Sequence, residues 1–361
     1  MSIAIRALQG SLDPTALGST ELQNGAIADL MAEIRDRQRV DGIRDERPVS
    51  TASFPLERIG VRSRYILDAD LTARDLARMS GRRALERAQV DPERVRCVIV
   101  SSSSGEPSVP PFAATVQADL GLRDGVVAFD LSVGCSGLVV ALDVASRILE
   151  SCPLGSAALV IAAETMSHVM DAGDRESCAI FGDGAGAVVL ERRDDVAPHH
   201  SRLYTGGNDG HKIQISDSST EFPIYRFRSR DGEIGVERDD VDPRHVILDG
   251  RRVFRDMLRM VPKHVQAHCE ESGNALESHD IVALHQANAR MTGAIGETLG
   301  LTSLPGNIER FGNTSSASIP LVLDELDQDQ RLQPGARILL CGFGSGYSIA
   351  SASLDYVGPA A

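Results

Sequence analysis

Apolar residues along the first half of the chain follow patterns typical of alternating helices and buried strands. A helical run that ends before Asp91 and Pro92 leads into the apolar segment CVIVSSS. A second apolar segment, VVAFDLS, is followed by a small-residue turn and an amphipathic helix. The expected elements are a helix at 75–88, strands at 97–103 and 126–132, a helix at 136–150, and strands at 157–164 and 181–191.

The second half repeats this order of elements. It is expected to contain a helix at 250–269, a strand at 280–286, a helix at 289–299, a helix opened by small residues within 311–326, and two strands joined by a glycine turn within 336–356. FGDGAGAVVL, beginning at Phe181, and GFGSGYSIASASL, beginning at Gly342, occupy corresponding places in the two halves. The chain is therefore expected to be an internally duplicated α/β protein.

Two polar stretches interrupt the pattern. Residues 192–243 are rich in Gly, Asp, Ser and His and show little periodicity, and residues 37–54 are charged. Each is expected to be either a loop that lines a substrate entrance or a plain solvated loop. The predicted organisation is a first half at 1–191, an insertion at 192–247 and a second half at 248–361.

Composition restricts the class of protein. With 361 residues and 42% hydrophobic content, the chain is expected to build a large core, and its net charge of -14 disfavours nonspecific binding to nucleic acid. The longest apolar runs are shorter than the roughly 18 residues that a membrane helix needs, and the N-terminus lacks an export signal, so a cytoplasmic protein is expected. Six cysteines without CxxC spacing predict neither a disulfide framework nor a metal site.

Cys135 is the strongest candidate nucleophile. It lies between an apolar strand and an apolar helix, which places its thiol near unpaired backbone N–H groups and favours the thiolate. Gly134 and Gly137 allow a ligand and neighbouring backbone to approach closely. The alternative is an inert buried cysteine, which is the interpretation we adopt for Cys97, Cys152, Cys178 and Cys341.

His285 and Asn313 are candidate partners of this cysteine. His285 ends a buried strand, where it is either a satisfied core histidine or a site residue at the edge of a sheet. Asn313 precedes an expected helix, where a plain N-cap is the alternative. Together they supply two hydrogen-bond donors for a developing enolate, and the backbone N–H groups of Cys135 and Ser345 form a second candidate oxyanion hole.

Four segments, DLSVGCSGL, HQANARM, GNTSSASIP and GFGSGYS, resemble the signature segments of the β-ketoacyl-acyl-carrier-protein synthase III family. The resemblance extends over nearly the whole chain. It implies a thiolase fold, which is a duplicated five-layer αβαβα sandwich, and a homodimer with a Cys-His-Asn site at the bottom of a tunnel. By motif, Cys135 accepts an acyl group, while His285 and Asn313 hold the thioester carbonyl of a second substrate.

The implied reaction is a Claisen condensation with a malonyl-type thioester, which loses carbon dioxide and yields a β-ketoacyl thioester. No cofactor is implied beyond the coenzyme A or phosphopantetheine thioesters that serve as substrates. Arg251 and Arg255 follow helical spacing, and with Arg290 they are candidate docking residues for an acyl carrier protein. The alternative for them is an ordinary solvated helix face.

The sequence also departs from the family pattern. Family members typically clamp the adenine of coenzyme A between a tryptophan and an arginine, but this chain has no tryptophan. We placed His168 in the segment that corresponds to that arginine, which favours a carrier-protein donor or an altered grip on coenzyme A. Val109 stands where family members often place a bulky aromatic residue in the acyl pocket, which favours a specialised biosynthetic role, such as polyketide assembly, over fatty-acid initiation.

Several alternatives remain. Glu106 could act as a base for a nondecarboxylative condensation of two acyl chains, as in relatives that make long-chain ketones or α-pyrones. Acyl transfer to oxygen or nitrogen is less favoured because Asn313 is retained, and a non-catalytic partner subunit is less favoured because Cys135 and His285 are also present. GCSGL does not match the papain-like cysteine segment, and neither glycine turn has the GxGxxG spacing of dinucleotide-binding proteins.

Overall fold

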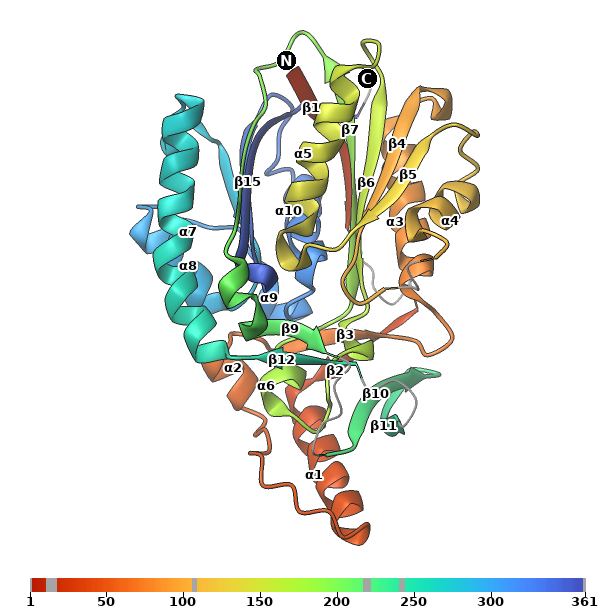
Figure 1. The fold of residues 1–361 in the computed structure, drawn as a ribbon, viewed down its shortest axis with the longest axis vertical. Helices are drawn as coiled ribbons and strands as arrows, with labels where there is room; N and C mark the ends of the chain where they lie inside the picture. Colours follow the sequence, from red (N-terminus) through yellow and green to blue (C-terminus); the bar gives the residue numbers. More distant parts are fainter. Residues whose placement is uncertain (1, 11–17, 106–108, 217–221, 240–243, 360–361) are drawn as a thin grey trace.

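A long mixed β-sheet runs through the molecule in the computed structural model, which describes residues 2–10, 18–105, 109–216, 222–239 and 244–359 (Figure 1). The strand order is β13-β14-β15-β1-β7-β6-β4-β5, and β8 also pairs with β15. The strands are β1 (Ser2–Gly10), β4 (Val95–Ser101), β5 (Val127–Leu131), β6 (Ala157–Glu164), β7 (Gly184–Arg193), β8 (His200–Thr205), β13 (Ile281–Leu284), β14 (Arg337–Gly344) and β15 (Ser348–Tyr356).

The sheet consists of two similar halves. In the first, β7 runs antiparallel to both β6 and β1, and β4 runs parallel to β6. In the second, β15 runs antiparallel to both β14 and β8, and β13 runs parallel to β14. The halves join where β1 and β15 pair in parallel, at Ala4 with Asp355 and Ile5 with Tyr356. The duplicated α/β unit predicted from the sequence is confirmed.

Helices lie between and outside the two halves of the sheet. Figure 1 shows α5 and α10 in the middle, α3 and α4 on one outer face, and α7 and α8 on the other, which gives five layers. Leu138, Val139 and Leu142 of α5 are buried, as expected for a helix covered by a sheet on each side. The helices are α3 (Ala73–Ala88), α4 (Phe112–Asp119), α5 (Gly137–Glu150), α7 (Gly250–Ser272), α8 (Ala289–Thr298) and α10 (Ser318–Gln328).

The segment expected to be an irregular insertion contains regular structure. β8 belongs to the main sheet, and two small antiparallel pairs follow it, β9 with β12 and β10 with β11. Tyr225 and Phe227 of β10 are buried, because apolar partners from distant segments cover an otherwise polar strand. These strands are β9 (Ile213–Ser216), β10 (Ile224–Arg230), β11 (Glu233–Asp239) and β12 (His245–Leu248).

Shorter elements complete the fold around the site. The remaining ones are β2 (Ser19–Gln23), β3 (Ser63–Leu67), α1 (Asn24–Val40), α2 (Phe54–Arg58), α6 (Arg175–Cys178), α9 (Ile308–Phe311) and the 3-10 turns η2 (Pro92–Arg94), η3 (Gly134–Ser136), η4 (Met166–His168), η5 (Gly207–Lys212), η6 (Leu276–Ser278), η7 (Ser315–Ala317) and η8 (Ser345–Tyr347). Residues 41–53, most of the charged stretch, have no helix or strand. Among the described residues, no helix combines the length and apolarity that a membrane crossing requires.

Candidate active site

One pocket brings together side chains from both halves of the molecule. Cys135, His285 and Asn313 all line it, although they come from segments far apart in the sequence. The rest of the wall is mainly apolar, with contributions such as Met166, Ile215 and Met257. The pocket therefore combines a thiol and polar donors with a surface suited to an apolar chain.

Glycines allow two turns to meet at the cysteine. Cys135 lies in η3, directly before α5. A Cβ atom on Gly344 would lie 3.0 Å from Cys135 Sγ, and one on Gly134 would lie 2.4 Å from Ser345 Oγ. Only glycine lets η8 approach the nucleophile this closely.

The Cys135 thiol is protonated in the unliganded pocket. Burial raises its pKa to about 11, and this outweighs the lowering by hydrogen bonds from the Ser315 hydroxyl and the Ser345 N–H. Ser315 Oγ lies 3.6 Å from Cys135 Sγ, and the negative charge of Glu164 raises the pKa further. The thiolate that we expected at the mouth of a helix is therefore not the resting form, because burial has the larger effect.

His285 is held as a neutral donor. Burial lowers its pKa to about 3, and its Nδ1 lies 2.6 Å from Ser318 Oγ. Ser318 Oγ also accepts a hydrogen bond of 3.3 Å from the Gln286 N–H, which directs the hydroxyl hydrogen toward Nδ1. We assign the tautomer from this pattern: Nδ1 accepts, and Nε2 carries the hydrogen that His285 can donate in the pocket.

Asn313 is fixed by its backbone and by its carbonyl oxygen. Its N–H donates to Ile180 O at 2.9 Å, and its carbonyl accepts from the Gly182 N–H at 3.2 Å. The Ser315 N–H donates to Asn313 Oδ1 at 2.8 Å. Because Oδ1 is occupied, the Nδ2 amide group is the end of the side chain that can donate to a ligand.

Arginines surround the mouth of the pocket. A hollow that shares Leu248 and Phe254 with the active-site pocket is lined by four arginines and an aromatic ring. These are Arg58, Arg175, Arg251, Arg290 and Phe54. In the part of the chain that the structure describes, no carboxylate lies within ion-pairing distance of Arg58, Arg251 or Arg290. The mouth is therefore suited to bind an anion such as a phosphate.

An arginine and an aromatic ring meet at this mouth, away from His168. Arg175 lies with its guanidinium carbon 4.5 Å from the centre of the Phe54 ring at this mouth, whereas His168 lines a separate hollow beside Thr165 and Arg244. Phe54 and Arg175 were missed by sequence reasoning. Their signal was the spacing of FPLERIG before the IGVRSRY segment and of DRES before IFGDGAG.

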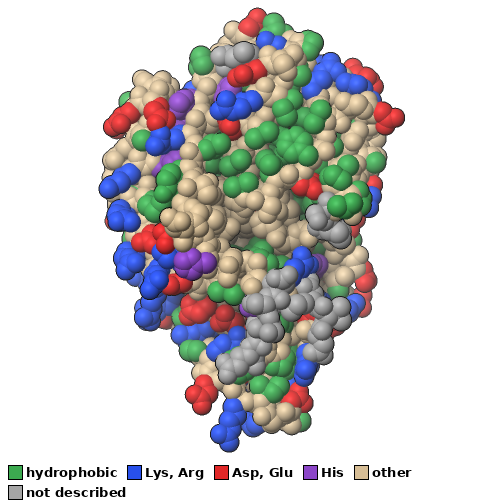
Figure 2. All heavy atoms as spheres, viewed as in Figure 1, with side chains coloured by type: hydrophobic (Ala, Val, Ile, Leu, Met, Phe, Trp, Pro, Cys, Tyr) green, Lys and Arg blue, Asp and Glu red, His purple; other side chains and the backbone are tan. Residues whose placement is uncertain are grey.

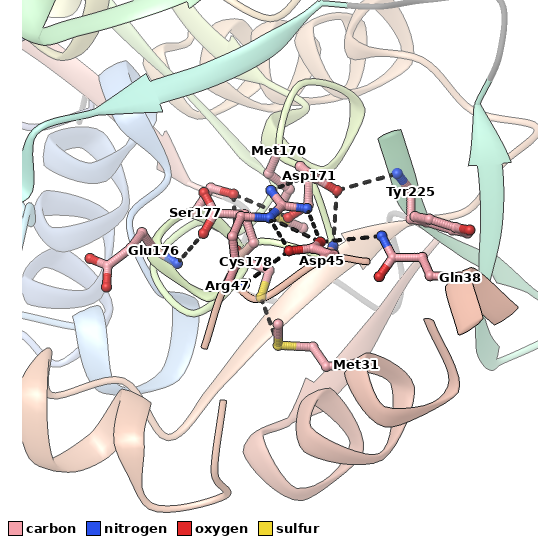
Figure 3. A network of polar contacts seen from close by, with 12 residues as sticks. Met31, Gln38, Asp45, Arg47, Met170, Asp171, Glu176, Ser177, Cys178 and Tyr225 are labelled. Atoms are coloured by element: carbon pink, nitrogen blue, oxygen red, sulfur yellow. Dashed lines mark hydrogen bonds and ion pairs between the residues drawn. The ribbon is translucent and has the colours of Figure 1, made fainter. Parts of the chain in front are cut away.

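A polar network holds the two walls of this mouth together (Figure 3). Arg47 forms ion pairs with Asp45 at 2.7 Å and with Asp171 at 2.8 Å, and so joins the segment before Phe54 to the loop before Arg175. Burial alone raises the pKa of Asp45, but hydrogen bonds from Arg47 and Arg35 outweigh it and lower that pKa to about 2. The carboxylate therefore stays charged, and the bridge stays closed, at neutral pH.

Val109 and Arg255 are not brought together with the pocket. Glu106 lies outside the described residues. Val109 is 83% exposed and lies outside the pocket lining, and Arg255 lies on the outer side of α7, where it pairs with Asp256 at 3.5 Å. Figure 2 shows further Lys and Arg side chains along the edge that α7 forms.

The fold and this pocket define the class of protein: a thiolase-fold condensing enzyme, in which a cysteine and two hydrogen-bond donors face a shared pocket. Two family models match the chain, 3-oxoacyl-[acyl-carrier-protein] synthase III at residues 129–207 and its C-terminal part at residues 269–356. The chain belongs to the 3-oxoacyl-[acyl-carrier-protein] synthase III family. It is thus a ketosynthase, an acyltransferase that forms carbon–carbon bonds, as predicted.

Relatives of known name agree with this assignment. The chain is 35% identical over 307 residues to a beta-ketoacyl-[acyl-carrier-protein] synthase III from Synechococcus, covering 84% of this chain and 87% of the relative. It is 34% identical over 316 residues to the enzyme of that name from Alkalilimnicola ehrlichii, covering 86% and 93%. Among solved structures, the priming β-ketosynthase of the R1128 polyketide pathway matches with a TM-score of 0.82 and 28% identity, covering 99% of this chain and 97% of that one.

Proposed function

We propose that Cys135 accepts an acyl group from a thioester, and that His285 and Asn313 then activate a malonyl-type thioester for decarboxylative condensation with it. The observation that carries this proposal is the convergence of the three side chains on one largely apolar pocket. Both side chains can donate to a thioester carbonyl. His285 Nδ1 and Asn313 Oδ1 are already hydrogen-bonded within the protein, which leaves His285 Nε2–H and Asn313 Nδ2–H as donors.

The first step is transthioesterification. The Cys135 sulfur attacks the carbonyl carbon of the donor thioester, the carbon–sulfur bond to the donor breaks, and the thiol proton passes to the leaving thiolate. The Ser345 N–H and the Ser315 hydroxyl stabilise negative charge on the attacking sulfur. The pKa of about 11 already includes these two hydrogen bonds, so the sulfur gains its negative charge only as the thiol proton leaves during attack.

The second step forms the carbon–carbon bond. His285 Nε2–H and Asn313 Nδ2–H hold the carbonyl oxygen of the malonyl thioester, its carboxylate leaves as carbon dioxide, and the electron pair becomes an enolate. The enolate carbon attacks the acyl carbonyl of Cys135, whose oxygen is held by the N–H groups of Cys135 and Ser345. The Cys135 thiolate then leaves and takes a proton from solvent, which releases a β-ketoacyl thioester.

The substrates are proposed to be coenzyme A or phosphopantetheine thioesters, with no other cofactor. Arg58, Arg251 and Arg290 at the mouth suit the phosphates of either arm. The stacked pair of Phe54 and Arg175 provides a flat cationic surface in place of the family's tryptophan and arginine. The exposed basic residues of α7, including Arg255, are proposed to dock an acidic acyl carrier protein.

We further propose a homodimer that uses the free edge of β5. Within the described part of the chain, β5 pairs on one side only, with β4, yet its sequence is VAFDL. Figure 2 shows apolar side chains gathered over α5 and β5, and Val127 is 50% exposed. Such an edge is suited to pair with a second copy, which would cover Val127 and bring Val109 near the partner's pocket. Val127→Lys is expected to shift the dimer toward monomer in light scattering.

Intact-mass measurement tests the nucleophile. After incubation with a panel of acyl thioesters, the wild type is expected to gain the mass of one acyl group, and Cys135→Ala is expected to gain none. Cys269→Ala removes another partly exposed thiol and is the matched control, expected to acylate normally. Equal acylation of wild type and Cys135→Ala would contradict the proposal.

Released carbon dioxide tests the type of condensation. Acyl-loaded enzyme is mixed with malonyl, methylmalonyl or β-ketoacyl carrier proteins, and both carbon dioxide and product mass are measured. The proposal predicts product with one equivalent of carbon dioxide from a malonyl-type partner. Product from a β-ketoacyl partner without carbon dioxide would instead favour the nondecarboxylative reaction with Glu106 as base.

A further inference from the structure

Tyr347 has an unusual backbone conformation directly beside the proposed oxyanion hole. It is the last residue of η8, two positions after Ser345, and its φ angle is +50°. A residue with a side chain pays about 1–2 kcal/mol for this left-handed conformation, whereas glycine adopts it freely. Tyr347 is nevertheless 1% exposed. The surrounding structure must therefore hold this residue in place.

Polar and cationic groups on two other elements hold the Tyr347 side chain. Its hydroxyl donates a 2.9 Å hydrogen bond to Asp256 Oδ2 on α7. Lys212 Nζ, at the end of η5, lies 4.9 Å from the centre of the Tyr347 ring and 3.5 Å from Asp256 Oδ2. The Gly206 N–H donates to the Tyr347 carbonyl at 3.0 Å. The side chain and the backbone of Tyr347 are thus both fixed.

These contacts persist at neutral pH. Burial raises the pKa of Tyr347 to about 12, so the hydroxyl keeps the hydrogen that it donates. The hydrogen bond from Tyr347 and the charge of Lys212 lower the pKa of Asp256, so this carboxyl remains an acceptor. The side chains of Lys212 and Asp256 are only 11% and 13% exposed, which limits competition from water.

The opposite side of the same turn is tied to the nucleophile. Ser348 Oγ donates to the Ser345 carbonyl at 2.8 Å and lies 2.7 Å from Ser136 Oγ, next to Cys135. Ser345 therefore lies between two anchors, one on the cysteine turn and one formed by Tyr347. A backbone hydrogen bond from Ser345 lowers the pKa of the Cys135 thiol, and a Cβ atom on Gly344, the residue before Ser345, would lie 3.0 Å from Cys135 Sγ.

We propose that Tyr347, held by Asp256 and Lys212, is a positioning residue that aims the Ser345 N–H at the Cys135 sulfur and at the oxyanion of the acyl group. This inference rests on the proposed function and deepens it. Tyr347 does not touch the reacting atoms, so removing its hydroxyl leaves the pocket wall and the substrate contacts intact. What weakens is the stabilisation of negative charge, first on the Cys135 sulfur and then on the oxygen of the acyl group.

The chain contains a matched control on β15, the strand that directly follows Tyr347. Tyr356, at the far end of β15, is also 1% exposed, and its hydroxyl donates to Asp327 Oδ1 at 2.6 Å. Tyr356→Phe therefore removes the same atom from the same kind of bond, away from the pocket. A general loss of stability will affect both variants, whereas loss of positioning will affect Tyr347→Phe alone.

The test compares Tyr347→Phe, Asp256→Asn and Tyr356→Phe. For the first two, kcat of condensation is expected to fall about tenfold with KM within about twofold, because the donor is misplaced but not removed. The pH profile of Cys135 alkylation by iodoacetamide is expected to move up by about one pH unit, since thiolate loses a well-aligned hydrogen bond. The double variant should lose no more than either single variant.

A wild-type alkylation profile and kcat in Tyr347→Phe would overturn the proposal, as would equal losses in Tyr356→Phe. If Tyr347→Phe proves too unstable to assay, Asp256→Asn keeps the ring and gives the same readout. Failure of the proposed function gives a different result, because Cys135→Ala would then still form product. In that case no variant of Tyr347 would be informative about Cys135.

Discussion

The two glycine turns that occupy corresponding places in the two halves support different groups. The first, at residues 182–184, precedes β7, and the second, at residues 344–346, precedes β15. Each lies against the start of a central helix that belongs to the opposite half. The first-half turn holds Asn313, before α10, and the second-half turn holds Cys135, before α5.

The first-half turn is a rigid support. A Cβ atom on Gly182 would lie 2.4 Å from the Phe311 carbonyl oxygen, and Asp183 Oδ1 accepts from the Ser167 N–H at 2.8 Å. Burial raises the pKa of Asp183. This turn offers its backbone to Asn313 but presents no group of its own to the substrate.

The second-half turn lies against the nucleophile and directs a peptide N–H toward it. A backbone hydrogen bond from Ser345 lowers the pKa of the Cys135 thiol, and contacts of Tyr347 and Ser348 anchor the turn. The comparison shows that the two halves of the duplicated fold build the active site together. Each half positions a reactive group of the other, so the site requires both halves to be docked.

Gly182→Ala is expected to have the largest effect. Its new methyl group meets a backbone carbonyl, which cannot move aside as a flexible side chain can. We expect the free energy of unfolding to fall by about 3 kcal/mol, measured by urea denaturation. Gly293→Ala on α8 is the control, because nothing lies within 4 Å of its Cβ position. Wild-type stability in Gly182→Ala would refute the supporting role of this turn.

Gly344→Ala should impair both stability and chemistry, because the φ angle of Gly344 is +158°, which residues with a side chain rarely adopt. Its methyl group would lie 3.0 Å from both Cβ and Sγ of Cys135, and so would displace the sulfur from its donors. We expect the rate of Cys135 acylation to fall about 100-fold, measured by rapid quench and intact mass. If acylation proceeds at the wild-type rate, the close approach of the second turn has no catalytic role.

Acid should weaken the second half in particular. Its outer helix α7 meets the sheet through buried His264 and His268, which bond to Ser351, whereas α3 packs on the first half with apolar residues. Burial lowers the pKa of these histidines from 6.5 to about 4 and about 3. The unfolded chain therefore binds protons that the folded chain does not, and stability falls as pH falls below about 6.5.

The expected loss is roughly 2 kcal/mol of unfolding free energy per histidine between pH 7 and pH 5. Urea denaturation at the two pH values measures it. His268→Gln should remove part of this pH dependence, because glutamine does not titrate. Equal pH dependence in the wild type and His268→Gln would show that the histidine interface is not the acid-sensitive element.

Ser318→Ala should have the smallest effect. It removes the hydroxyl that directs the tautomer of His285 but leaves the imidazole in the pocket. We expect kcat of condensation to fall about tenfold while acylation of Cys135 remains normal. Ser316→Ala, two residues away, loses a bond to Glu164 instead and separates the two roles. Slower acylation in Ser318→Ala would contradict the assignment of His285 to the second step.

Local patterns predicted much of the fold. The strand expected at 157–164 is β6 without change, because a continuous apolar run of only 8 residues between turns is short for a helix and favours a buried strand. β8 and β10 were missed because their residues are polar or mixed, and partners distant in the sequence decide their pairing. Propensity alone carries no information about such partners.

Site residues that lie within a sequence motif were predictable. Properties that depend on burial or on contacts in the folded chain were less so. Cys135, His285 and Asn313 were found from short segments, and they share a pocket. The protonated state of Cys135 depends on the protein that encloses it, which a helix boundary does not reveal. Phe54 and Arg175 meet across more than a hundred residues, so their pairing emerges only in three dimensions.

The most direct test of the central claim is a single-turnover experiment that separates the two halves of the site. Enzyme acylated on Cys135 is mixed with a malonyl carrier thioester, and carbon dioxide and β-ketoacyl product are followed in the wild type, His285→Ala and Asn313→Ala. We predict that all three acylate, but that both variants release carbon dioxide at least about 100-fold more slowly. Release of carbon dioxide at the wild-type rate in either variant would contradict the account.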